Sequence, residues 1–77
     1  MNEGEVRDVA VRGDGIRLGQ LLKLAGIAGS GAEAKALLLD GAVRVNGDAE
    51  GRRGRQLVVG DVVQAGDDAV RVVRAEA

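Results

Sequence analysis

In the segment "IRLGQLLKLAGIAGSGAEAKALLLDGAVRVNG", residues 16–47, two helix patterns are followed directly by a hairpin pattern, and this order indicates the type of fold. In its first part, apolar residues recur at Leu18, Leu21, Leu22 and Ala25, the i, i+3, i+4, i+7 spacing of one helix face. Gly26 comes next, and glycine readily adopts the left-handed conformation in which many helices end. A short amphipathic helix ending at Gly26 is therefore predicted.

A second helix is predicted to begin at Ser30, because "SGAE" places Glu33 three residues further along. In this capping-box arrangement each side chain accepts a hydrogen bond from an exposed backbone N–H at the helix start. Ala34 and residues 37–38 continue an apolar face, and Gly41 supplies the stop. The two short helices, joined by "GIAG", are expected to pack as a pair.

Beyond the second helix the apolar pattern changes to a period of two, which predicts strands. Val43 and Val45 point to one face, and Arg44 points to the other. Asn46-Gly47 is the strongest short signal for a hairpin turn. Three further valine-rich runs, "QLVV", "DVVQA" and "AVRVV", are separated by Gly60-Asp61 and "GDD", and residues 5–12 contain one more.

These elements predict an α+β domain: two short packed helices followed by a small, bent antiparallel sheet of about four to five strands. Whether residues 5–12 join that sheet is left open by the pattern. A chain of 77 residues is expected to form a single domain, residues 1–77. Its core must come from 12 Val, 8 Leu, 2 Ile and 12 Ala without any aromatic residue, so a stability of only a few kcal/mol is expected.

Several classes of chemistry are not expected. Without Cys or His the chain lacks a thiolate, the commonest general base and the commonest metal ligands. Ser30 is the one side-chain hydroxyl, and an enzyme would have to rely on Lys23 or Lys35 as its reactive amine. We therefore expect no enzyme activity, no cofactor and no metal. The start of the sequence carries acids and no apolar run, so a cytoplasmic protein without a membrane partner is expected.

The charges are unevenly distributed, although the net charge is only −1. Residues 1–16 hold two basic and four acidic side chains, residues 17–60 hold seven and four, and residues 61–77 hold two and four. A basic middle thus lies between acidic ends. Local charge of this kind matters more for recognition than the total.

Three arginines, Arg52, Arg53 and Arg55, follow the predicted hairpin with glycines around them. The planar guanidinium group suits paired hydrogen bonds to phosphate. The other interpretation is a loop kept soluble by its charges, with Arg favoured over Lys by coding bias. Proteins that read single-stranded nucleic acids stack bases on aromatic side chains. This chain has none, so an RNA partner would be recognised by backbone and shape.

Taken together, "LGQLLKL", "SGAEAK", "VRVNG" and "RRGRQLVVGD" resemble, in order and spacing, the alpha-L RNA-binding motif of the domain named after ribosomal small-subunit protein S-four. The resemblance runs from Ile16 to about Val73, and it is closest to the short free-standing bacterial members, the YaaA and YbcJ type. The matching positions are Leu18, Leu22, Gly26, Ile27, Ser30, Ala34, Leu37, Leu38, Gly41, Val43, Val45, Asn46, Gly47, Gly60 and Asp61.

The resemblance implies binding to structured RNA, ribosomal or transfer RNA, by a basic face on the helix pair and the following hairpin. Many relatives have Arg directly after the serine, whereas this chain has Gly31, so the contact made there is not carried over. Ser30 is expected to cap the helix and Asn46 to shape the turn. The residues implied as RNA-binding phosphate contacts are Lys23, Lys35, Arg44, Arg52, Arg53 and Arg55.

The function predicted from the sequence is thus that of a non-catalytic, monomeric RNA-binding protein. The alternative is a protein-interaction adaptor, in which the same basic face meets an acidic protein partner or a sheet edge pairs with a partner strand.

Overall fold

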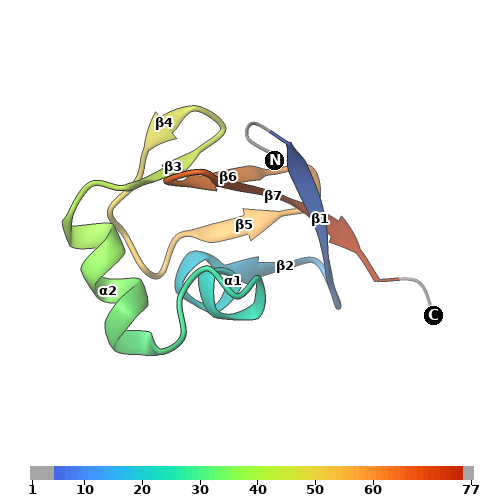
Figure 1. Ribbon diagram of the computed structural model, residues 1–77. Coiled ribbons are helices and arrows are strands. Elements are labelled where there is room, and N and C mark those ends of the chain that lie inside the picture. Colours follow the sequence, from blue (N-terminus) through green and yellow to red (C-terminus); the bar gives the residue numbers. More distant parts are fainter. Residues whose placement is uncertain (1–4, 76–77) are drawn as a thin grey trace.

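The computed structural model describes residues 5–75, which form two helices, a five-stranded sheet and a separate two-stranded sheet (Figure 1). The helices are α1 (Leu18–Leu24) and α2 (Gly31–Leu39). The larger sheet has the strand order β1-β7-β6-β3-β4, and the smaller one pairs β2 with β5. The strands are β1 (Val6–Val11), β2 (Gly15–Arg17), β3 (Val43–Val45), β4 (Asp48–Ala49), β5 (Gln56–Val58), β6 (Val62–Ala65) and β7 (Asp68–Arg74).

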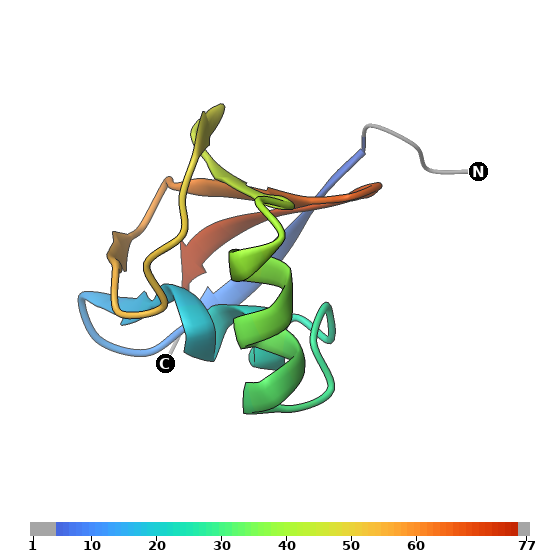
Figure 2. The ribbon, with the colours of Figure 1, turned by 90° about the vertical axis from the view of Figure 1, so that its left-hand side faces the viewer.

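The two layers of the molecule are the five-stranded sheet and, on one side of it, the helix pair with the smaller sheet; both views show this arrangement (Figures 1 and 2). The largest fully buried side chains come from both layers and form one aliphatic core between them. They are Leu18, Leu21, Leu22, Val43, Val45, Leu57, Val63, Val70 and Val72. No helix within residues 5–75 combines the length and the apolar character needed to cross a membrane.

Helix α1 follows the predicted apolar pattern. Leu18, Leu21 and Leu22 are completely buried, and Gly26 has a φ of 76° just after the helix, which confirms the predicted stop. The side chain of its N-cap residue, Arg17, makes no capping hydrogen bond, and the Gln20 Oε1 accepts only a long one, 3.4 Å, from the Arg17 N–H. Instead the backbone N–H groups of Leu18 and Gly19 donate to carbonyl groups of a loop more than 30 residues away along the chain. The start of α1 therefore depends on a tertiary contact, which a local pattern does not reveal.

The cap of helix α2 agrees with the prediction in one half and differs in the other. The Ser30 Oγ accepts a hydrogen bond from the Glu33 N–H at 3.1 Å, as expected. The Glu33 Oε2, however, accepts from the N–H of Gly29 at 2.7 Å, one residue before the serine. The glutamate thus ties down the connection between the helices as well as the helix start. Gly41, with a φ of 72°, ends the helix as predicted.

The hairpin predicted at Asn46-Gly47 is present between β3 and β4. Both turn residues have positive φ, 52° and 90°, as a two-residue turn of this kind requires. The Asn46 side chain also reaches a second loop: its Nδ2 donates to the Asp61 Oδ1 at 3.0 Å, and its Oδ1 accepts from the Val62 N–H at 2.9 Å. Asn46 therefore shapes the turn and fixes the hairpin to the connection between β5 and β6.

The predicted antiparallel pairing is confirmed for β3 with β4, β3 with β6 and β6 with β7. It does not extend to β1, the segment whose place was left open, because β1 joins the sheet at its edge in parallel with β7. The register runs from Val6 opposite Ala69 to Val11 opposite Arg74. Parallel pairing needs a long connection between the two strands, and here the helices and the other strands supply it. This pairing joins segments from opposite ends of the sequence. The alternation of residues along one strand does not indicate which strand lies beside it or in which direction, so the parallel pairing could not be predicted.

Strand β2 was not predicted. It has only three residues, too few to show a period, and it pairs antiparallel with β5. Gly15 in this strand lies so close to the backbone carbonyl of Leu57 that a Cβ atom would overlap with it. The pairing turns the chain directly into α1 and brings β5 beside the start of that helix.

Candidate functional site

Residues 50–55 connect β4 to β5 and pack against the start of α1, as Figure 2 shows. The carbonyl groups of Arg53 and Arg55 accept hydrogen bonds from the N–H groups of Gly19 and Leu18, both at 2.9 Å. A Cβ atom at Gly19 would overlap with the side chain of Arg53. Glycine at this helical position therefore lets the loop come close, and the loop in turn caps the helix.

Glu50 is the buried charged side chain of the described residues, with only 8% of its surface exposed. Its Oε2 accepts from the backbone N–H and the Nε of Arg52, both at 3.0 Å, and its Oε1 accepts from the Arg52 Nη2 at 3.2 Å and the Arg55 Nη1 at 2.9 Å. These hydrogen bonds, first those with the Arg52 side chain and then that with Arg55, lower the pKa of Glu50 to about 2.

The low pKa of Glu50 predicts a dependence of stability on acid. The pKa in the fold is about 2 against an ordinary value of 4.5, so the unfolded chain takes up the proton first as the pH falls. The stabilisation is fully present above the unfolded pKa and is lost between pH 4.5 and about 2. We expect the urea midpoint of the protein to fall across this interval more steeply than that of Glu50→Gln. Parallel curves would show that other carboxylates govern acid unfolding.

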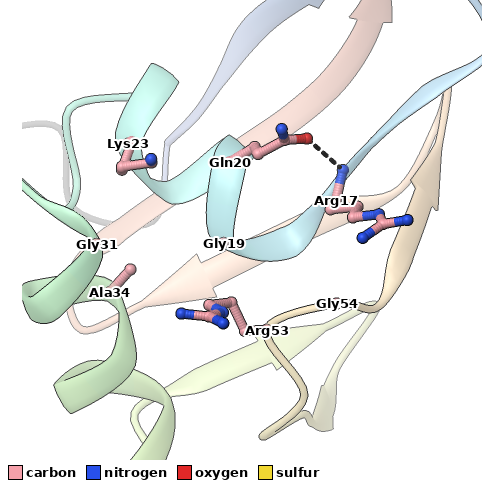
Figure 3. A pocket seen from close by; sticks show the side chains of 8 residues that line it. All are labelled: Arg17, Gly19, Gln20, Lys23, Gly31, Ala34, Arg53 and Gly54. Carbon is pink, nitrogen blue, oxygen red and sulfur yellow. Dashed lines mark hydrogen bonds between the residues drawn. The ribbon is translucent and has the colours of Figure 1, made fainter.

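A hollow of about 330 Å³ lies between α1, the beginning of α2 and the loop 50–55 (Figure 3). Its basic side chains are Arg17, Lys23 and Arg53, which come from three different segments of the chain. Among the described residues, its lining contains no acidic side chain, and none of the three cations forms an ion pair. The lining residues are Arg17, Gly19, Gln20, Lys23, Gly31, Ala34, Arg53 and Gly54.

The details of the hollow favour an anionic ligand. Figure 3 shows the Arg53 side chain reaching from its loop toward α2, across from Lys23 on α1. Gly31 adds no side chain, and the space around it is open. The Gln20 Oε1 accepts a weak hydrogen bond from the Arg17 N–H at 3.4 Å. Three like charges around one space repel each other, and bound phosphate oxygens would relieve that repulsion.

The six predicted site residues fall into three groups. Lys23 and Arg53 meet in the hollow. Arg52 and Arg55 pair with Glu50, with 77% and 32% of their side chains exposed. The remaining two, Lys35 on α2 and Arg44 on β3, are exposed and lie outside the lining of the hollow. The Arg44 Nη1 donates to the Gly47 carbonyl at 3.3 Å, across its own hairpin.

Two residues of this region were not singled out in the sequence. Arg17 directly precedes the first apolar position of α1. Its only indication as a binding residue was that it belongs to the basic excess of residues 17–60. Glu50 stands two residues before Arg52, but an acid next to a basic cluster does not reveal that it is buried. Arg17 meets Arg53 only because the loop packs against the start of α1, and the burial of Glu50 follows from its contacts with Arg52, Arg55 and β3.

Comparison with known proteins places these features in a family. The model of the S4 domain family matches residues 9–73. A protein of Bacillus subtilis named "Probable ribosome maturation protein RlbA" is 53% identical over 49 residues, which are 64% of this chain and 69% of that protein. A protein of Escherichia coli named "Putative RNA-binding protein YbcJ" is 40% identical over 58 residues, which are 75% of this chain and 83% of that protein.

Proposed function

The chain belongs to the S4 domain family, and we propose that it is a non-catalytic RNA-binding protein that recognises structured RNA at the basic hollow. One observation carries the proposal: Arg17, Lys23 and Arg53 converge on one hollow without an acidic neighbour in its lining. The names of the two relatives, which refer to RNA binding and to ribosome maturation, support it.

The chemistry of the hollow suits the phosphate backbone of RNA. Arginine binds phosphate oxygens with two parallel hydrogen bonds, and lysine contributes a compact charge. The first turn of α2 borders the same space at Gly31 and Ala34, and the N-terminal end of a helix adds positive potential. The exposed cations Lys35 and Arg44 are proposed to add further contacts, Lys35 along α2 and Arg44 at the hairpin.

Structured RNA is the proposed class of partner, with ribosomal RNA favoured because one relative is named as a ribosome maturation protein. The chain has no aromatic side chain on which unpaired bases could stack. Recognition by shape and phosphate position is the usual solution for double-helical RNA. A protein of this kind binds RNA without distinguishing most of its nucleotide sequence.

The proposal is tested with an RNA hairpin and a single strand of the same length, each titrated with the protein across a salt series. We expect tighter binding to the hairpin. Log affinity should fall linearly with log salt, and each phosphate contact should add about 0.7 to 0.9 to the slope. The three cations of the hollow should then contribute about −2 to −3 to it, and Lys35 and Arg44 should steepen it further. Absence of binding to both RNAs, together with binding to an acidic protein, would support the adaptor function instead.

A further inference from the structure

We infer that Glu50 is a positioning residue of the proposed RNA-binding site. Its carboxylate binds the side chains of Arg52 and Arg55 within the loop 50–55. The loop is thereby held in the conformation that directs Arg53 into the hollow. The inference rests on the proposed function. It divides the three neighbouring arginines, which look equivalent in the sequence, into one ligand-binding residue and two structural ones.

The first support is the geometry of the carboxylate. Glu50 holds Arg52 through its backbone N–H and its guanidinium group, and it holds Arg55 through its guanidinium group. These two residues flank Arg53 on either side. The N–H of Glu50 itself donates to the Val43 carbonyl at 3.0 Å, which fixes the carboxylate to β3. Both ends of the segment that contains Arg53 are therefore tied to the sheet.

The second support is the closure of the loop on α1. The Arg55 N–H donates to the Arg52 carbonyl at 3.2 Å, so the segment between them is a tight turn. From this turn the Arg53 and Arg55 carbonyls cap α1. Without the carboxylate, three arginines within four positions would repel one another at this turn. Glu50 thus compensates the charges that would otherwise open the loop.

The charge balance separates a positioning role from a simple electrostatic one. Glu50→Gln removes a negative charge and raises the net charge from −1 to 0. If only the local field mattered, RNA affinity would increase. If the carboxylate positions Arg53, affinity decreases even though the protein becomes more positive. The matched control is Asp48→Asn in β4, which makes the same charge change at an exposed residue two positions away.

The experiment compares both variants with the unmodified protein for binding to the RNA hairpin. We expect Glu50→Gln to bind about tenfold more weakly, a loss typical of removing a group that orients a ligand-contacting residue. Asp48→Asn should bind as tightly as the unmodified protein or slightly more tightly. Equal affinity of the two variants, or tighter binding by Glu50→Gln, would overturn the inference.

Amide hydrogen exchange tests the same inference without RNA. The Leu18 and Gly19 N–H groups are protected by the loop carbonyls, so Glu50→Gln should exchange them faster while sheet amides such as that of Val70 keep their rates. If Glu50→Gln does not fold, Arg52→Gln leaves the carboxylate paired with Arg55 and should speed exchange at the same two amides to a smaller extent. Unchanged exchange at both amides would overturn the inference. Absence of RNA binding by the unmodified protein would instead refute the proposed function. The exchange experiment needs no RNA, so it would still show whether Glu50 holds the loop against α1.

Discussion

Replacing Arg17, Lys23 and Arg53 together by Gln is expected to lower the affinity for the RNA hairpin by about a hundredfold or more. A hydrogen bond to a charged group contributes about 1.5 to 3 kcal/mol, and each 1.4 kcal/mol corresponds to a factor of ten. Three such contacts therefore exceed two orders of magnitude even if each is at the weak end. The slope of log affinity against log salt should flatten by about 2 to 3. Fluorescence anisotropy with labelled hairpin across the salt series measures both quantities.

The matched control for this variant removes the same number of charges elsewhere. Arg12 directly follows β1, and Arg71 and Arg74 lie in β7; none of them lines the hollow. Their joint replacement by Gln should change the affinity by less than about threefold at physiological salt, because salt screens exposed charges that make no direct contact with the ligand. Equal losses in the two triple variants would show that total charge, not the hollow, determines binding.

The largest effect on folding is expected for Leu22→Ala. Leu22 is completely buried in the core, and its carbonyl accepts the N–H groups of Ile27 and Ala28 in the connection to α2. Truncating a buried leucine to alanine costs about 2 to 5 kcal/mol, because it removes apolar contacts and leaves a cavity. A domain of this size without disulfides is stable by only about 3 to 5 kcal/mol. The variant should therefore be largely unfolded at 37 °C, as circular dichroism would show.

The same substitution at Leu39 provides the control. Leu39 is the last residue of α2 and is 76% exposed, so its truncation removes little buried surface. Alanine is also a good helix former, and the urea midpoint of Leu39→Ala should stay close to that of the unmodified protein. If Leu22→Ala and Leu39→Ala had the same urea midpoint, the assignment of Leu22 to the core would be contradicted.

The arginine cluster illustrates how far a sequence pattern leads. Three arginines between glycines drew attention to the loop 50–55, but the pattern treated them as one group. The fold separates them, because Arg52 and Arg55 meet a buried carboxylate while Arg53 faces the hollow. Arg17 and Lys23 approach from α1 and the strand before it. Their proximity to Arg53 depends on a contact across more than 30 residues, which no local pattern records.

Elements with a local cause could be predicted from the amino-acid sequence alone. The leucine stripe and Gly26 specify α1, Ser30 and Glu33 specify the start of α2, and Asn46-Gly47 specifies the hairpin, since each signal acts within about four residues. Three features could be seen only in the folded chain: the parallel pairing of β1 with β7, the pairing of β2 with β5, and the burial of Glu50 beneath two arginines. These features depend on which segments the shared core brings together, and burial then selects among charges that look alike along the chain.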